Sequence, residues 1–166
     1  LNHANLLGEV LDKRYRIVRK VGEGGMSFVY LAQDVATSEK YAIKVLSPAL
    51  AKDTNAMARL RREAGLGIRL AHPNVCHIMR LGETEEGLVY VVMPFVDGEI
   101  LSDRTHRKGQ IPLAQAAKWV KEIAQGLQLA HELKIIHRDL KPENIMICRG
   151  GDGEDYAVVM DFGLAK

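Results

Sequence analysis

The stretch His137-Arg138-Asp139-Leu140-Lys141-Pro142-Glu143-Asn144 contains six polar residues in eight positions. Apolar residues border it on both sides, as Ile135-Ile136 before it and Ile145-Met146-Ile147 after it. Apolar flanks of this kind can be buried and can therefore anchor a rigid loop. We expect such a loop to hold one carboxylate, one lysine and one amide around a reacting phosphate group.

A second carboxylate, Asp161, follows the apolar stretch Val158-Val159-Met160 and precedes Phe162-Gly163. The apolar stretch is typical of a strand, which places Asp161 at a strand end. The amide of Asn144 and this carboxylate would form a site made only of oxygen ligands. Such ligands suit Mg²⁺ rather than zinc. The sequence therefore favours a magnesium site at Asn144 and Asp161.

A glycine-rich stretch, Gly22-Glu23-Gly24-Gly25-Met26-Ser27, precedes the strand-like segment Phe28–Ala32. Glycine lets a backbone approach a phosphate closely and direct its N–H groups toward it. Taken alone, the pattern fits an ordinary turn equally well. A dinucleotide-binding loop would lead from a strand into a helix, whereas this stretch joins two strands. The pattern therefore favours a flap over a nucleotide.

Residue alternation along Tyr41-Ala42-Ile43-Lys44 places Lys44 on the same face as Ala42 and Leu46. We therefore expect Lys44 to face inward and to need an anion. Glu63 is the candidate partner, because Leu60 and Ala64 lie near it on one face of a predicted helix. Two interpretations stay open at this point. The pair has a structural role only, or it presents Lys44 to phosphates.

The remaining pattern predicts a strand-rich first half and a mainly helical second half, with a lobe boundary near Asp97-Gly98. Five antiparallel strands are expected over Tyr15–Val21, Phe28–Ala32, Tyr41–Leu46, Asn74–Leu81 and Leu88–Val96. One helix is expected between them, from about Asp53 to Ala71, with Asp53 or Thr54 as its cap. Further helices are expected over Leu101–Arg107 and Pro112–Glu132, and a hairpin over Ile145–Cys148 and Tyr156–Met160.

The motifs GEGGMSFV, YAIK, an inward-facing helix glutamate, HRDLKPEN and DFG follow one another in this order. Together they resemble the N-terminal part of the catalytic domain of Hanks-type, eukaryotic-like serine/threonine protein kinases, bacterial members in particular. Lys141 within HRDLKPEN resembles serine/threonine rather than tyrosine kinases. The resemblance implies an α+β, bilobal fold. Residues 1–14 would be an N-terminal extension, 15–96 a five-stranded N-lobe with one main helix and the hinge, and 97–166 a partial C-lobe that ends just after DFG.

The resemblance also implies a role for each motif residue. Asp139 would accept or orient the proton of the substrate hydroxyl, and Lys141 would lie near the γ-phosphate. Lys44 would contact the α- and β-phosphates of ATP and would be held by Glu63. Mg²⁺, or Mn²⁺, would be held by Asn144 and Asp161.

The same resemblance implies an ATP site. The backbone of the glycine-rich stretch would cover the phosphates, although Ser27 stands where the family usually has its third glycine. Val29, Ala42 and Met146 would sandwich the adenine, and Met93 would lie at the back of the pocket. In the hinge, Pro94 would supply a carbonyl and Val96 an N–H. The complete set is Gly22, Glu23, Gly24, Gly25, Met26, Ser27, Val29, Ala42, Lys44, Met93, Pro94, Val96 and Met146.

The net charge, the longest apolar run and the cysteine count exclude several classes of partner and site. The formal net charge of +2 is too balanced for nucleic acid or an anionic membrane to be the main partner. The longest apolar run, Leu88–Val96, has nine residues, which is too short to cross a bilayer. Two separate cysteines, Cys76 and Cys148, exclude a disulfide framework and a cysteine zinc site, and we expect both to be buried and reduced. A cytoplasmic catalytic domain is expected, and membrane tethering of the parent protein stays open.

Two classes of function compete. One is a signalling enzyme that phosphorylates serine and threonine hydroxyls on proteins, with possible autophosphorylation or self-association. The alternative is a non-catalytic pseudokinase or an ATP-binding interaction module. We expect the segment alone to be inactive and to expose an apolar stripe on its longest helix. The basic residues Arg59, Arg61 and Arg62 would be a solvated helix face or a site for a phosphorylated loop. Gly65 and Gly67 predict a weak helix that leaves Glu63 displaced in an inactive state, unless Gly67 merely accommodates a bulkier neighbour.

Overall fold

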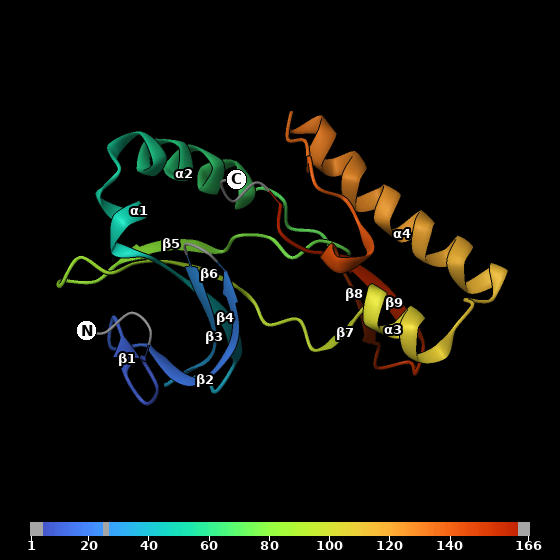
Figure 1. Cartoon of the computed structure of the whole chain (residues 1–166), viewed down its shortest axis with the longest axis horizontal. Coiled ribbons are helices and arrows are strands. Elements are labelled where there is room, and N and C mark those ends of the chain that lie inside the picture. Colours follow the sequence, from blue (N-terminus) through green and yellow to red (C-terminus); the bar gives the residue numbers. More distant parts are fainter. Residues whose placement is uncertain (1–4, 25–26, 163–166) are drawn as a thin grey trace. The chain divides into compact units, whose positions relative to one another are not determined.

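The computed structural model describes residues 5–24 and 27–162, which form two compact units (Figure 1). The first unit comprises residues 5–65 and 78–95. The second comprises residues 66–77 and 96–162. None of the helices in the described part of the chain is both long enough and apolar enough to cross a bilayer.

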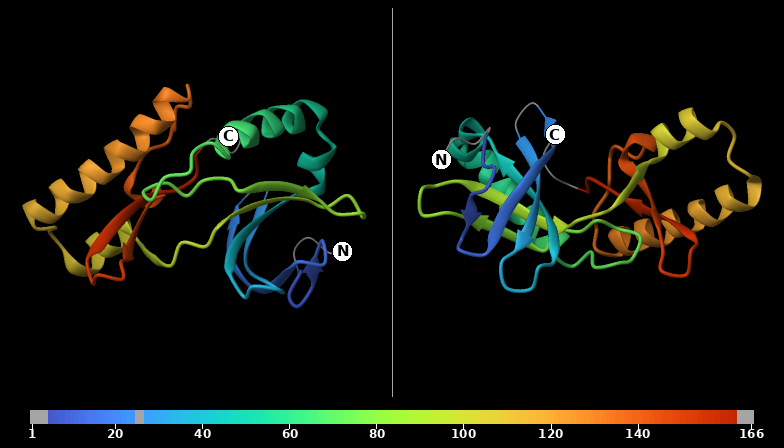
Figure 2. Two further views of the ribbon diagram at one scale, coloured as in Figure 1. Left: turned by 180° about the vertical axis from the view of Figure 1, so that it is seen from behind. Right: turned by 90° about the horizontal axis from the view of Figure 1, so that it is seen from below.

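The first unit is built on a six-stranded antiparallel sheet, which curls strongly in both views of Figure 2. Its spatial order is β1-β2-β3-β4-β6-β5. The strands are β1 (Val10–Leu11), β2 (Tyr15–Gly24), β3 (Ser27–Asp34), β4 (Lys40–Leu46), β5 (Arg80–Glu83) and β6 (Val89–Pro94). The sequence predicted five of these strands and missed β1, because a two-residue strand carries no measurable alternation.

The strand predicted over Asn74–Leu81 is wrong in its first part, since β5 begins only at Arg80. The backbone of the preceding residues is used in the second unit. There, Cys76 N donates to Val159 O over 2.9 Å, and Val159 N donates to Asn74 O over 2.8 Å. An apolar run indicates burial but does not reveal which strand its backbone will pair with.

Residue alternation gives the sheet of the first unit two different faces. One face carries the hydrophobic core, which includes four tyrosines. The core residues are Leu6, Leu11, Tyr15, Ile17, Tyr30, Ala32, Tyr41, Ile43, Val45, Leu88, Tyr90 and Val92. Leu6 and Leu11 belong to the segment expected as an N-terminal extension, and they are 0% and 1% exposed. Residues 5–14 therefore contribute to the core.

Two helices follow β4, α1 (Pro48–Lys52) and α2 (Thr54–Gly67). The Asp53 side chain caps α2 as predicted, because its Oδ1 accepts from Asn55 N at 3.0 Å and Ala56 N at 2.9 Å. The helix ends at Gly67 instead of Ala71. Glycine favours helix ends, and the chain continues in a turn closed by Leu70 N donating to Gly67 O. Helix α1 was not predicted.

The second unit combines a three-stranded antiparallel sheet with three helical segments. In chain order these are β7 (Gly98–Ile100), α3 (Leu101–Lys108), α4 (Leu113–Glu132), the 3-10 helix η1 (Pro142–Asn144), β8 (Ile145–Arg149) and β9 (Asp155–Val159). The predicted hairpin and both long helices are confirmed, whereas β7 was not predicted. Helix α4 buries Trp119, Gly126 and Ala130.

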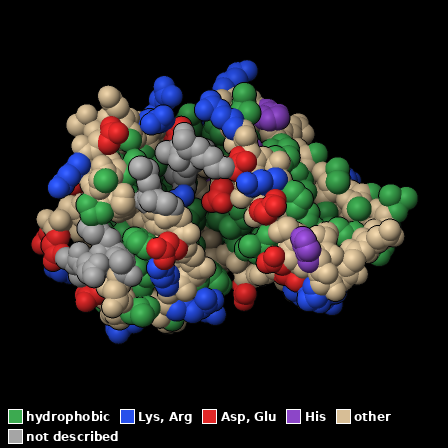
Figure 3. All heavy atoms as spheres, in the orientation of Figure 1, with side chains coloured by type: hydrophobic (Ala, Val, Ile, Leu, Met, Phe, Trp, Pro, Cys, Tyr) green, Lys and Arg blue, Asp and Glu red, His purple; other side chains and the backbone are tan. Residues whose placement is uncertain are grey.

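Part of the predicted apolar stripe on α4 lies at the surface. Leu113 is 86% exposed and Val120 is 64% exposed. Figure 3 shows hydrophobic side chains reaching the surface of this unit. Helix α4 therefore presents two apolar faces, one buried against β9 and one exposed.

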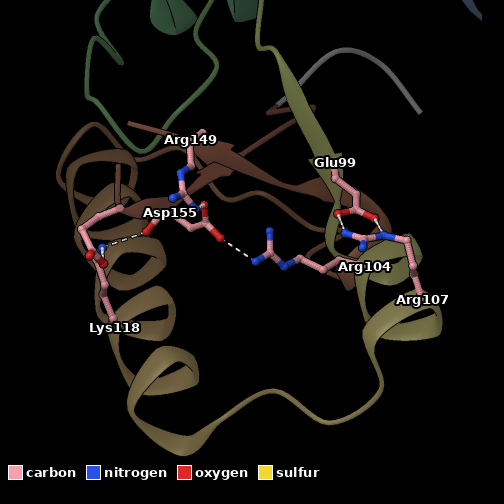
Figure 4. A network of polar contacts seen from close by, with 7 residues as sticks. Glu99, Arg104, Arg107, Lys118, Arg149 and Asp155 are labelled. Carbon is pink, nitrogen blue, oxygen red and sulfur yellow. Dashed lines mark hydrogen bonds and ion pairs between the residues drawn. The ribbon is translucent and has the colours of Figure 1, made fainter. Parts of the chain in front are cut away.

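A polar network joins α3 and α4 to the β8–β9 hairpin (Figure 4). Asp155 forms ion pairs with Arg104 of α3 and with Arg149 of β8. Lys118 of α4 donates to the backbone oxygen of Asp155 over 2.7 Å. The Arg104 guanidinium also lies 5.3 Å from the centre of the Trp119 ring. These contacts fix the hairpin that leads into residues 160–162.

We expect alanine substitutions at two helix glycines, Gly65 and Gly126, to change the free energy of unfolding in opposite directions. A Cβ at Gly65 in α2 would meet no atom within 4 Å, so Gly65→Ala should add about 0.5–1 kcal/mol. A Cβ at Gly126 in α4 would lie 2.8 Å from Val75 Cγ2, so Gly126→Ala should remove about 1–3 kcal/mol. Urea unfolding of the two variants measures both effects. A destabilised Gly65→Ala protein or a stabilised Gly126→Ala protein would contradict this packing.

Candidate active site

The loop after α4 gathers two polar side chains around one carboxylate, that of Asp139. Asn144 is buried, and its Nδ2 donates to Asp139 O over 2.8 Å and to Asp139 Oδ2 over 3.1 Å. Lys141 Nζ lies 3.6 Å from the same Oδ2. The turn itself is closed by Asn144 N, which donates to Lys141 O over 2.9 Å. The sequence predicted a loop holding a carboxylate, a lysine and an amide, and the structure brings these three groups together.

His137 ties this loop to the segment after β9. Its Nε2 lies 2.7 Å from Met160 O, and its Nδ1 accepts from Asp139 N over 3.2 Å. The ring is therefore a donor at Nε2 and an acceptor at Nδ1. The His137 and Phe162 rings meet edge to face, with centroids 4.7 Å apart. No hydrogen bond was predicted for His137, although a histidine beside two isoleucines could have signalled a buried, hydrogen-bonded ring.

Two residues of this site have left-handed backbone conformations, Arg138 with φ 69° and Asp161 with φ 57°. Such values are uncommon outside glycine and cluster at functional sites. Asp161 is exposed and directly follows Met160, whose N–H donates to Asn144 O over 2.8 Å. One backbone hydrogen bond thus joins the segment that carries Asp161 to Asn144, the other predicted magnesium ligand.

The oxygen atoms that Asn144 and Asp161 offer are suited to a magnesium ion. The Asn144 amide uses its nitrogen on Asp139, which leaves Oδ1 as its acceptor, and Asp161 supplies an exposed carboxylate. Oxygen atoms of these types are the usual ligands of Mg²⁺, which keeps several waters and needs few protein ligands. Within residues 5–24 and 27–162 there is no group of three or more His, Cys, Asp or Glu side chains suited to a metal. Asn144 and Asp161 as ligands stay a prediction.

The first unit places four of the predicted nucleotide-binding residues on one face of its sheet. Lys44 is directly opposite Val29 on β3 and Val91 on β6, and Ala42 is directly opposite Met93. Residues directly opposite each other in an antiparallel pair point to the same face. This face is the one that does not carry the tyrosine-containing core.

The predicted orientation of Lys44 needs a correction. The buried face of β4 carries Tyr41, Ile43 and Val45, whereas Ala42 and Lys44 are half-buried on the opposite face. Alternation correctly grouped Lys44 with Ala42, but it could not tell which face holds the core. Glu63 is half-buried on α2. The pairing of Lys44 with Glu63 stays a prediction.

The other predicted nucleotide-binding residues lie at strand ends and in the second unit. Gly22, Glu23 and Gly24 end β2, and Ser27 begins β3 directly opposite Gly24. Gly25 and Met26 lie outside the described residues. Pro94 ends β6 opposite Tyr41. Val96 and Met146 are half-buried in the second unit, where Met146 is opposite both Ile100 and Val158.

Asn74 forms hydrogen bonds both to a neighbouring residue and to a strand of the second unit. Its N–H donates to His72 Nδ1 over 3.0 Å. Its buried side chain also donates from Nδ2 to Ala157 O on β9 over 2.8 Å. Asn74 therefore helps to hold the strand that leads to Asp161. Its position between a proline and an apolar stretch was a signal for burial that sequence analysis did not use.

Both cysteines are free and buried, as predicted. Burial raises the pKa of the Cys76 thiol to about 12, and the charge of Asp161 adds to this effect. Burial raises the pKa of the Cys148 thiol to about 11. Neither thiol is therefore an activated nucleophile.

Comparisons with known proteins agree with one another. The family model described as protein kinase domain matches residues 15–166. The serine/threonine-protein kinase PknB of Mycobacterium leprae is 41% identical over 159 residues, which cover 94% of this chain and 25% of that protein. PrkC of Bacillus subtilis, also named a serine/threonine-protein kinase, is 38% identical over 160 residues, covering 96% of this chain and 24% of PrkC. The chain thus spans about a quarter of the length of these curated relatives.

A solved structure shows the same fold. The kinase domain of PknI from Mycobacterium tuberculosis matches with a TM-score of 0.78 at 30% identity. The match covers 98% of this chain and 63% of the PknI domain.

The raised thiol pKa values predict how stability depends on pH. Below pH 9.0, the ordinary thiol pKa, both thiols are protonated in the folded and the unfolded chain. As the pH rises from 9 toward 12, the unfolded chain loses protons that the folded chain retains, so the free energy of unfolding falls. At pH 10 each thiol should account for a loss on the order of 1 kcal/mol.

Urea unfolding at pH 8 and pH 10 measures this loss. The control is the Cys76→Ala/Cys148→Ala protein, which retains every other titrating group and should lose less stability between the two pH values. An equal loss in both proteins would show that the thiols ionise normally in the folded state.

Proposed function

Because the chain belongs to the protein kinase family, we propose that the protein containing it transfers the γ-phosphoryl group of ATP to serine and threonine hydroxyls of proteins. The observation that supports this most strongly is the arrangement of Asp139, which Asn144 and Lys141 both contact at Oδ2. The relatives named above are serine/threonine-protein kinases, so the kinase class and the resemblance identified from the motifs are confirmed. The kinase-like α+β fold is confirmed as well.

In the second unit, Asp139 is the proposed acceptor for the proton of the substrate hydroxyl. A general base must be held within hydrogen-bond reach of that proton. Asn144 fixes both the backbone oxygen and the carboxylate of Asp139, which limits how far the carboxylate can rotate. The Lys141 ammonium, held near the same carboxylate, supplies positive charge for the transferred phosphoryl group.

In the first unit, the sheet face that carries Lys44 is the proposed binding surface for ATP. Val29, Ala42 and Met93 supply apolar contacts for the adenine, and Lys44 lies in the same register to bind phosphate oxygens. The backbone of residues 22–27 would cover the phosphates.

Asn144 and Asp161 would hold Mg²⁺ or Mn²⁺, which supplies charge neutralisation between the β- and γ-phosphates when bound. The chain's own contribution is to orient the two side chains. Asn144 is fixed by its amide contacts, and Asp161 is fixed by the left-handed backbone after β9. We further propose protein substrates, autophosphorylation and a cytoplasmic location for the catalytic domain, each of which follows from the family rather than from a contact in this chain.

Substitution of the catalytic carboxylate tests the proposal. The full-length protein with Mg·ATP should phosphorylate itself and casein, and Asp139→Asn should lower the rate on the order of 10²-fold or more. Lys44→Ala and Asp161→Ala should each have losses of similar size. The matched control is Asp103→Asn, which removes an exposed carboxylate of α3 and should leave the rate unchanged.

Phosphate incorporation and ADP release are the two readouts. Near-normal turnover in Asp161→Ala would refute the proposed chemistry. A wild-type protein that binds ATP and transfers no phosphoryl group would instead establish the alternative, an ATP-binding module without catalysis.

A further inference from the structure

The turn between β1 and β2 carries a carboxylate that reaches the opposite edge of the sheet. Strands β1 and β5 are the two edges of the first unit's sheet. Asp12 lies in the β1–β2 turn, and its Oδ2 accepts from Arg80 Nη2 of β5 over 3.1 Å and from the phenol of Tyr90 on β6. We refer to Asp12, Arg80 and Tyr90 as the Asp12 cluster. One carboxylate therefore connects the first edge of the curled sheet to the last.

The β1–β2 turn has a left-handed backbone at two successive residues. Asp12 and Lys13 have φ values of 49° and 56°, and Arg14 N donates to Leu11 O over 3.0 Å. Aspartate is one of the few residues that tolerate left-handed backbone. The Asp12 side chain is 23% exposed, although its turn is at the surface. The turn conformation thus directs the carboxylate toward the sheet.

Tyr90 is fully buried, and the absence of a side chain at Gly82 leaves space for its ring. Gly82 of β5 is directly opposite Tyr90, and a Cβ at Gly82 would collide with the ring. Tyr15 contacts the ring edge to face, with centroids 6.4 Å apart. Burial raises the pKa of the phenol, and its hydrogen bond to Asp12 raises that pKa further, so the phenol remains a donor. Without Asp12, this buried donor would lose its acceptor.

The Asp12 cluster lies next to the predicted phosphate-binding lysine in the sheet. Tyr90 is directly opposite Val45, and the next residue, Val91, is directly opposite Lys44. Any shift of β6 at Tyr90 therefore moves the strand that pairs with Lys44. The Asp12 cluster contains none of the residues proposed to act on the phosphoryl group in the second unit.

We propose that Asp12 is a positioning residue for nucleotide binding, because it fixes Tyr90 and through β6 the orientation of Lys44. This inference rests on the proposed function, since it assigns Lys44 to ATP. It extends that function to residue 12, which precedes the kinase-family match. Loss of Asp12 should weaken ATP binding while the transfer step, assigned to Asp139, keeps its rate.

The turn offers a matched pair of variants for the test. Asp12→Gly removes the carboxylate without backbone strain, because glycine accepts positive φ. Lys13→Gly makes the same change at the neighbouring left-handed residue, whose side chain is exposed. Tyr90→Phe removes only the phenol oxygen and keeps the ring. All variants are made in the full-length protein and assayed at a temperature where each is folded.

Asp12→Gly and Tyr90→Phe should each raise KM and Kd for ATP by about 3- to 10-fold, the effect of one lost hydrogen bond. Their kcat values should stay within about twofold of wild type, because saturating ATP compensates for a loss of binding alone. The double variant should be no worse than the more severe single variant, since both remove the same contact. Hydrogen exchange of the β6 amides should accelerate in Asp12→Gly and not in Lys13→Gly.

Equal KM and Kd values for Asp12→Gly and Lys13→Gly would overturn the inference, as would a fall in kcat with unchanged KM. A purely structural role would lower the melting temperature without moving KM for ATP. If the wild-type protein binds ATP and transfers no phosphoryl group, the proposed function fails, and the Kd comparison still decides the role of Asp12.

Discussion

The amide of Asn144 is buried, and a buried amide must find hydrogen-bond partners or destabilise the fold. Its nitrogen finds both partners on one residue, Asp139. The backbone oxygen of Asn144 accepts a hydrogen bond from the N–H of Met160, the residue before Asp161. The hydrogen bonds of Asn144 thus fix the loop, the Asp139 carboxylate and the segment after β9. His137 repeats this pattern, because it bonds Asp139 N on one side and Met160 O on the other.

A different constraint shapes the first unit. Alternation along β4 sends Tyr41, Ile43 and Val45 into the core, so Ala42 and Lys44 must occupy the other face. Lys44 is half-buried there, which suits a lysine that binds an anion while retaining access to solvent. The core in turn depends on residues before the kinase-family match, since Leu6 and Leu11 are among its least exposed members. Packing on one face leaves the other for the proposed nucleotide site.

Sequence patterns predicted the elements whose signals are local. Strands β2, β3, β4 and β6, helices α3 and α4 and the β8–β9 hairpin all follow from periodicity and turn residues. The two-residue β1, the three-residue β7 and the late start of β5 depend on which strand each segment pairs with, and no local pattern records that. The motifs around Asp139 predicted which groups gather there. They did not reveal that Asn144 contacts Asp139 directly, because such a contact depends on the turn of η1. Whether Lys44 binds Glu63 depends on the placement of α2, which periodicity does not determine.

Asp139 and Asn144 are proposed to act as one unit in phosphoryl transfer. Groups that act as one unit give strongly non-additive losses when both are removed. The most direct test is the kcat of the full-length protein with Asp139→Asn, with Asn144→Ala and with both substitutions. We expect the double variant to be no slower than the slower single variant. A double variant whose loss equals the product of the two single losses would show that Asp139 and Asn144 act independently.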